Sequence, residues 1–160
     1  AWFLERTIQR NRLEDVLKLQ FQADRYGPYS PRLNHLLDAL DGSYLRSDKR
    51  IADCGPLDTI GFNEAKADVV AAYLRSGEAK LYAPVLDETD ALIDGFQSPF
   101  GMELLATVDW LLRREDCQPE TSSIRAALAN WSGGSDAGQR KLRLFNDQAI
   151  SLALERLTAS

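Results

Sequence analysis

The sequence predicts an α+β fold that is predominantly helical, with a small β-sheet near the N-terminus. Apolar residues recur at helical spacing through most of residues 61–160, whereas residues 1–60 contain an alternating stretch and two short apolar stretches typical of strands. A chain of 160 residues that is 44% hydrophobic buries a sizeable core without disulfides or metals. We therefore expect a single domain over residues 1–160, with a winged-helix-like part at 1–60 and a helical part at 61–160.

The N-terminal residues read as a helix followed by a strand. Trp2, Phe3 and Ile8 fit a helix that is already under way, and the chain opens on Ala1 without a methionine. We therefore expect the chain to be the C-terminal piece of a longer protein. From Leu17 to Ala23, apolar and polar residues alternate strictly, which predicts a half-buried strand.

A rigid turn and a leucine-rich helix follow. The turn consists of Tyr26, Gly27, Pro28 and Tyr29, and it ends on an N-cap serine and a proline at the first helical position. The spacing of the next apolar residues predicts a helix that ends near Gly42, in the order Leu33, Leu36, Leu37 and Leu40. Short strands at 44–46 and 57–60, either side of a charged loop, complete a winged-helix outline.

The remaining sequence predicts five helices. Asn63 caps a helix that stops at Gly77, residues 86–95 form the next after a break at Pro84, and Ser98 with Pro99 begins a third. Residues 121–131 form a shorter helix. After a loop at 132–135, Leu142, Phe145, Ala149 and Leu152 line one long final helix.

The residue types that carry catalysis are sparse. His35 is the one histidine, Cys54 and Cys117 are 62 positions apart, and no glycine-rich phosphate loop is present. Glu103 and Asp109 are six positions apart, which turns them to different faces of one predicted helix. From these residues we expect no metal and no cofactor, and an enzyme that uses carboxylates ranks as a distant third interpretation.

The charge is concentrated in one quarter of the chain. The net charge is −5, but residues 86–120 hold nine acidic and two basic side chains. Asp87, Asp90 and Asp94 fall at i, i+3 and i+7, so they share one face of the predicted helix, roughly 4.5–6 Å apart along its axis. A solvated surface is the favoured interpretation on these residues alone. Imitation of a nucleic-acid backbone is the alternative, and it requires a DNA-binding protein as partner.

Direct binding of nucleic acid is the main competing interpretation. Arg46, Lys49 and Arg50 lie where the wing of a winged-helix protein contacts phosphate. The helix that would read the bases offers few polar side chains, and Asp38 on it would repel phosphate. We expect a winged-helix nucleic-acid-binding regulator only as the alternative.

Two segments resemble the C-terminal domain of DarG-type antitoxins. The first is the Tyr26–Tyr29 turn with its flanking strand and leucine helix, and the second is DGFQSPFGMELLATV at 94–108. The resemblance spans nearly the whole chain. It departs from the family at Ser43 and Asp109, where the family tends to have histidine, so no role of those histidines is carried over.

The resemblance implies a binding function. DarG-type antitoxins join a macrodomain to a domain that binds the DarT toxin, an enzyme that ADP-ribosylates single-stranded DNA. The hydrolase would lie in the macrodomain, so the expectation for this chain is a toxin-binding domain that is not itself an enzyme. The acidic face at Asp87, Asp90 and Asp94 would block the toxin's DNA site, and the Tyr26–Tyr29 turn either contacts the partner or orients the leucine helix.

Location and assembly are also predicted. The sequence contains no apolar stretch of membrane-spanning length and no signal peptide, and two cysteines do not make a disulfide framework. We expect a cytoplasmic protein, with no membrane partner, that is a monomer on its own.

Overall fold

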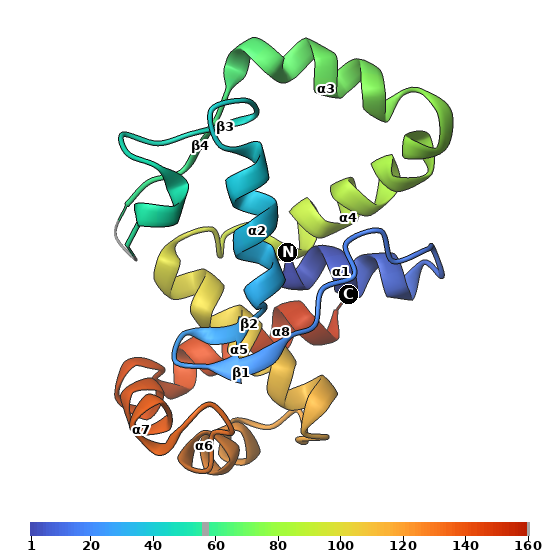
Figure 1. Ribbon diagram of the computed structural model, residues 1–160. Helices are drawn as coiled ribbons and strands as arrows, with labels where there is room; N and C mark the ends of the chain where they lie inside the picture. Colours follow the sequence, from blue (N-terminus) through green and yellow to red (C-terminus); the bar gives the residue numbers. More distant parts are fainter. Residues whose placement is uncertain (56–57, 160) are drawn as a thin grey trace.

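The computed structural model describes residues 1–55 and 58–159. The described part holds eight α-helices and two separate two-stranded antiparallel sheets (Figure 1). The helices and strands in chain order are α1 (Trp2–Arg10), β1 (Gln22–Asp24), β2 (Gly27–Tyr29), α2 (Pro31–Leu40), β3 (Leu45–Arg46), β4 (Gly61–Phe62), α3 (Ala67–Leu74), α4 (Ala83–Ile93), α5 (Pro99–Arg114), α6 (Thr121–Ala129), α7 (Ser135–Leu144) and α8 (Asp147–Thr158). Short 3₁₀ turns lie at Ile51–Asp53 (η1), Glu64–Lys66 (η2) and Gly77–Tyr82 (η3).

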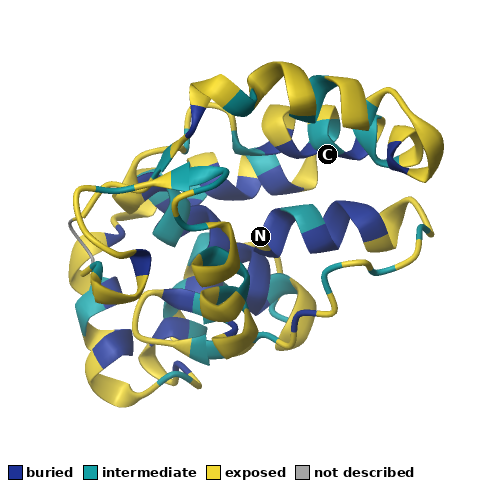
Figure 2. Cartoon of the chain, turned by 45° about the horizontal axis from the view of Figure 1, so that its top comes forward, coloured by how far each residue is buried: buried dark blue, intermediate teal, exposed yellow. Residues whose placement is uncertain are grey.

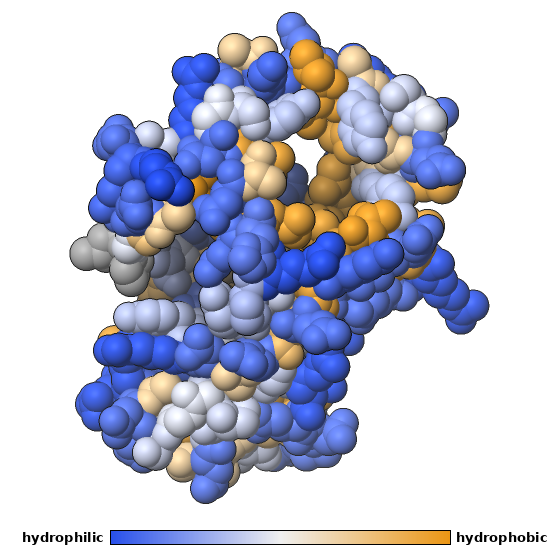
Figure 3. Space-filling model, viewed as in Figure 1, coloured by the Kyte–Doolittle hydropathy of each residue, from blue (hydrophilic) through white to orange (hydrophobic). Residues whose placement is uncertain are grey.

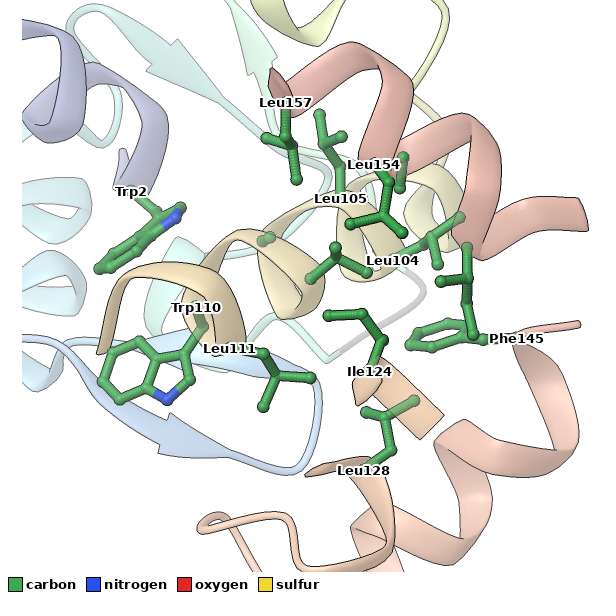
Figure 4. Packing of buried hydrophobic residues seen from close by; sticks show 14 of the residues in the cluster. Trp2, Leu104, Leu105, Trp110, Leu111, Ile124, Leu128, Phe145, Leu154 and Leu157 are labelled. Carbon is green, nitrogen blue, oxygen red and sulfur yellow. The ribbon is translucent and has the colours of Figure 1, made fainter. Parts of the chain in front are cut away.

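Helix α5 is the centre of the core. The hydroxyl of Ser98 accepts a hydrogen bond of 3.0 Å from the Gly101 amide, and Pro99 follows where its missing N–H costs nothing, so the helix begins sharply. Side chains from α1, α6 and α8 pack around it (Figure 4). The buried apolar side chains include Trp2, Leu104, Leu105, Val108, Leu111, Ile124, Leu128, Phe145, Ile150, Leu154 and Leu157.

The β1–β2 hairpin packs on α5. Gln22 pairs with Tyr29 and Asp24 with Gly27, and the Trp131 indole donates a 3.0 Å hydrogen bond to the Asp24 carbonyl. Gly27 has φ of 119°, and a Cβ there would lie 3.4 Å from Oγ1 of Thr107. Only glycine adopts this backbone readily, so the turn approaches α5 closely because position 27 is glycine.

Residues 31–93 leave the core and return to it as an arch, formed by α2, α3 and α4 with the turns between them (Figure 1). Every residue that the structure describes in α2 and α3 is half-buried or exposed. The helix that starts at the N label, α1, is by contrast largely dark blue in Figure 2. The arch therefore rests on the core mainly where α4 packs against α1.

Many predicted elements are confirmed. The fold is predominantly helical, and helices are present at 31–40 and from Pro99, as expected. The predicted segment at 121–131 contains α6, with Ile124, Leu128 and Trp131 buried as expected. Gly42 has a left-handed φ of 71° just after α2.

The N-terminal strands differ from the expectation. The alternating stretch from Leu17 forms a strand only at Gln22–Asp24, because its partner is three residues long and Lys18 has a φ of 50° that breaks the extended chain. The second small sheet pairs Leu45–Arg46 with Gly61–Phe62, so the prediction at 57–60 is misplaced, and Leu57 lies outside the described residues. Two separate sheets do not confirm a winged-helix arrangement.

Three helix boundaries also differ. Pro84 lies inside the first turn of α4, where a proline is tolerated, and this helix ends at Ile93 with Asp94 as its C-cap. The final long helix is two helices, because the chain turns at Phe145 and the Asn146 side chain caps α8 by accepting a 2.8 Å hydrogen bond from the Ala149 amide. Leu152 is consequently 52% exposed instead of facing the core.

Candidate partner-binding surface

Two acidic side chains of α4 lie on the face away from its packing, whereas a third, Glu88, pairs with Arg10 of α1. Val85, Thr89 and Leu92 are buried, whereas Asp87 and Asp90 are exposed. Within the residues that the structure describes, neither Asp87 nor Asp90 forms an ion pair with a lysine or arginine. Their charges are therefore available to a partner.

Asp94 differs from the other two predicted site residues. It follows the last residue of α4 as the C-cap, with φ of −56° and ψ of 130°, and one carboxylate oxygen accepts a 3.2 Å hydrogen bond from the Gln97 side chain. The structure therefore places two carboxylates on one helical face and the third just beyond its end.

The order of charges along α4 opposes its helix dipole. The first turn of the helix has no acidic residue and the last turn no basic one. Asp90 lies in the last turn and Asp94 is the C-cap, whereas Asp87 and Glu88 lie in the middle of the helix. Carboxylates stabilise the N-terminal end of a helix and destabilise the C-terminal end, typically by about 0.3–1 kcal/mol each. Helix stability alone does not explain this arrangement.

An arginine from the core compensates for part of that cost. Nη1 of Arg156, on α8, donates hydrogen bonds to the carbonyl oxygens of Ala91, Leu92 and Asp94 at 3.0, 3.1 and 2.6 Å. These carbonyls belong to the end of α4, where the helix itself supplies no donors. Arg156 thus anchors the acidic end of α4 to the core.

The arch also exposes apolar side chains. Six large hydrophobic residues between α2 and α4 are at least 38% exposed, namely Leu40, Ile60, Phe62, Val69, Tyr73 and Leu81. Figure 3 shows a hollow with hydrophobic side chains, coloured orange, on its walls, in the region where Figure 1 places α2, α3 and α4. Concentrated apolar exposure of this kind is typical of interaction sites.

Sequence patterns alone missed this apolar exposure. The spacing of Val69, Val70, Tyr73 and Leu74 predicts a helix with a face toward the core, and α3 is indeed a helix. Its sequence, ADVVAAYL, is apolar on nearly all sides, and a helix of that composition is normally buried. The signal was therefore present in the composition, but only the structure shows that the chain leaves this helix uncovered.

The two tyrosines of the Tyr26–Tyr29 turn differ in exposure. Tyr26 is 50% exposed, and the guanidinium carbon atoms of Arg25 and Arg140 lie 5.5 and 5.0 Å from the centre of its ring. Tyr29 is half-buried, and its hydroxyl accepts a 2.8 Å hydrogen bond from the Asn34 side chain of α2. Gly27 is buried and Pro28 half-buried. Tyr29 is thus hydrogen-bonded to the leucine helix, and both tyrosines remain predicted contacts.

The carboxylates considered for acid–base chemistry lie in separate ion pairs. Glu103 contacts Lys141 and Arg140, while Asp109 contacts Arg6 and Arg113. His35 is exposed on α2. Among the residues described, no group of three or more His, Cys, Asp and Glu side chains is placed to hold a metal ion. The described helices also include none long and apolar enough to cross a bilayer.

Comparison with known proteins gives a direct relationship over most of the chain. Two proteins named DNA ADP-ribosyl glycohydrolase, from Mycobacterium tuberculosis and Mycobacterium bovis, are each 31% identical to it over 152 residues, or 92% of this chain. The chain is similar to DNA ADP-ribosyl glycohydrolases. A third, from Thermus aquaticus, is 31% identical over 120 residues, which are 72% of this chain and 31% of that protein. No protein-family model matches the chain.

The DNA ADP-ribosyl glycohydrolases are longer than the part matched here. The chain spans 40% of the length of the two mycobacterial proteins. The similarity is consistent with the resemblance to DarG-type antitoxins.

The comparisons correct one expectation. We expected from the resemblance that this chain is not an enzyme. Its relatives over 92% of its length are named for a hydrolase activity, so that expectation is wrong as stated, and hydrolase activity is not excluded. The error arose because the activity was assigned to a macrodomain outside this chain, from the resemblance alone.

Proposed function

We propose that this chain is the part of a DarG-type antitoxin that binds and neutralises a DarT-type toxin, and that the acidic end of α4 occupies the toxin's site for single-stranded DNA. The observation that carries the proposal is the placement of Asp87, Asp90 and Asp94. All three are exposed, and Asp90 and Asp94 lie at the end of the helix that the helix dipole disfavours. A protein surface that binds DNA is basic, so these carboxylates complement it.

The apolar arch supplies a second kind of contact to the same partner. Leu40, Val69, Tyr73 and Leu81 are exposed on the arch of which α4 is the last helix. Interfaces combine an apolar centre with a polar rim, and the acidic residues then form part of that rim. Charge gives fast and specific association, while burial of the apolar side chains provides most of the affinity.

The charge part of the proposal is tested with a triple variant, Asp87→Asn, Asp90→Asn and Asp94→Asn. Its affinity for the cognate toxin is measured by titration calorimetry at low and high salt, without NAD so that no DNA modification takes place. We expect Kd to rise about tenfold at low salt and less at high salt, because salt screens the lost interactions. Equal affinities of the variant and the parent chain at low salt would contradict DNA imitation.

The matched control removes three exposed acidic charges elsewhere. Asp116→Asn, Glu120→Gln and Asp136→Asn change the net charge by the same amount on residues outside α4 and the arch. This control should bind with nearly the parent affinity. Competition adds a second readout: a short single-stranded oligonucleotide should displace the chain from the toxin if both use one site. The same preparation is assayed for release of ADP-ribose from modified DNA, because the relatives are named for that reaction.

A further inference from the structure

A cleft of about 550 Å³ lies between α1 and the C-terminal end of α5. Four arginines line it: Arg6 and Arg10 from α1, and Arg113 and Arg114 from the last turn of α5. Trp2 and Glu5 lie in the same lining. The resemblance and the comparisons assign no role to this cleft.

Arg6 is buried with its charge only partly compensated. It is 7% exposed, and its Nη1 lies 2.9 Å from Oδ1 of Asp109. The same Oδ1 accepts a 2.9 Å hydrogen bond from Nε of Arg113, so two guanidinium groups share one carboxylate oxygen. Within the described residues, neither Nη1 nor Nη2 of Arg6 makes a well-directed hydrogen bond. Burying a charged guanidinium whose N–H groups lack acceptors is costly, unless a second anion accepts hydrogen bonds from them.

Arg114 presents free donors at the rim of the same cleft. Its guanidinium carbon lies 5.7 Å from the centre of the Trp2 ring and 5.8 Å from that of Trp110. Among the residues described, no carboxylate is within ion-pair distance of it. The two indole rings hold the guanidinium in place, and its N–H groups remain available to a ligand.

Three carboxylates face the four arginines. Glu88 pairs with Arg10 at 2.8 Å, and Asp109 pairs with both Arg6 and Arg113. Glu5 is buried in the lining of the cleft, and its Oε2 lacks a hydrogen-bond partner among the described residues. Burial raises the pKa of Glu5, which favours its neutral form. The cleft therefore keeps a positive excess even with these acids counted.

We propose that this cleft binds a phosphate group of a ligand. Phosphate offers three or more oxygens to guanidinium groups from different directions, which suits the separated arginines at the floor and the rim better than the two oxygens of a carboxylate. The phosphate comes either from a small nucleotide-like molecule or from a nucleic-acid strand, and the chemistry recognised is the same. The proposal is independent of the toxin-binding surface.

The test is a titration of the 160-residue chain with inorganic pyrophosphate at constant ionic strength, followed by two-dimensional NMR. The chain has three tryptophans, and the indole N–H signals report on them separately. We expect saturable shifts for Trp2 and Trp110, which lie beside Arg114, and none for Trp131. Absence of these shifts, or equal shifts with acetate, would overturn the proposal.

A pair of variants locates the binding. Arg114 is exposed, so Arg114→Gln should fold, and it should weaken pyrophosphate binding about tenfold. Arg143→Gln, which removes an arginine that does not line the cleft, should change the affinity less than about twofold. An equal loss in both variants would overturn the proposal. A short oligodeoxythymidine that shifts the same signals at lower concentration than pyrophosphate identifies the strand as the source, and the reverse order identifies a small molecule.

Discussion

The ammonium group of Lys141 donates a 2.8 Å hydrogen bond to Oε1 of Glu103, although the Lys141 side chain is fully buried. The ammonium lies 5.3 Å from the centre of the Trp131 ring and 5.6 Å from that of Phe145. Both oxygens of Glu103 also accept hydrogen bonds from Arg140. One carboxylate therefore joins α5 to α7 and holds a buried charge.

Replacement of Glu103 should be far more damaging than replacement of Lys141. Glu103→Gln leaves a buried ammonium without a carboxylate, which should lower the free energy of unfolding by about 3–5 kcal/mol. In Lys141→Met, Glu103 keeps Arg140 as a partner, so we expect a change of about 1 kcal/mol or less. Urea denaturation followed by circular dichroism measures both. Equal losses in the two variants would contradict this account of the pair.

The same pair predicts a pH dependence. Burial lowers the pKa of Lys141, and the hydrogen bond with Glu103 opposes that shift. Between this lowered pKa and the unfolded value of about 10.4, the unfolded chain binds more protons, so stability rises with pH. Glu103→Gln removes the opposing effect and extends the window to lower pH. As the pH rises from neutral to alkaline, the difference in free energy of unfolding between the parent chain and the variant should therefore shrink. A difference that stays constant with pH would contradict this.

Asp109 should be the most important single residue for the position of α1. Its carboxylate contacts the Trp2 indole at 2.8 Å as well as Arg6 and Arg113. Asp109→Asn leaves Arg6 buried without its charge partner, and we expect a loss of about 3–5 kcal/mol in the free energy of unfolding. The exposed Asp87→Asn serves as control and should change stability by about 0.5 kcal/mol or less. Similar thermal midpoints for the two variants would argue against a structural role of Asp109.

Gly138 permits the close contact of α6 and α7. A Cβ at this position would overlap the carbonyl oxygen of Leu128, which is backbone and cannot move aside without shifting α6. Gly138→Ala should therefore destabilise the chain by about 1–3 kcal/mol, despite the better helix propensity of alanine. Gly55→Ala, whose Cβ meets only an ordinary contact at 3.5 Å, is the matched control. Thermal unfolding that ranks Gly138→Ala as the milder change would contradict this packing.

Elements with local start and stop signals were predictable from the sequence. Ser98 and Pro99 begin α5 by the contacts expected of those residue types, and Gly42 follows α2 in a left-handed conformation. The break before α8 was missed although Asn146 carries a capping side chain, because the apolar spacing continues across it. Apolar spacing thus identified the helical segment, but it did not show that the capping residue Asn146 divides this segment into two helices.

Most of the candidate surfaces could not be predicted from the sequence, because they depend on contacts between residues far apart in the chain. Arg6 and Asp109 are far apart in the sequence, so nothing in their local patterns pairs them. The leucines of α2 have the spacing of a core helix, yet the structure leaves them half-buried or exposed. Burial is decided by what packs against a face, and the arch has no covering layer among the described residues. That Asp87 and Asp90 share one helical face was predictable from the sequence, because this follows directly from their spacing.

The most direct test of the account is neutralisation of the cognate toxin by this chain. The 160-residue chain is mixed with the toxin before NAD and a single-stranded oligonucleotide are added, and the initial rate of DNA modification is measured. The account predicts that the rate falls in proportion to the chain added up to one equivalent, and that the Asp87, Asp90 and Asp94 triple variant requires about tenfold more chain under dilute conditions. An undiminished initial rate with excess chain would contradict the claim that this polypeptide binds the toxin at its DNA site.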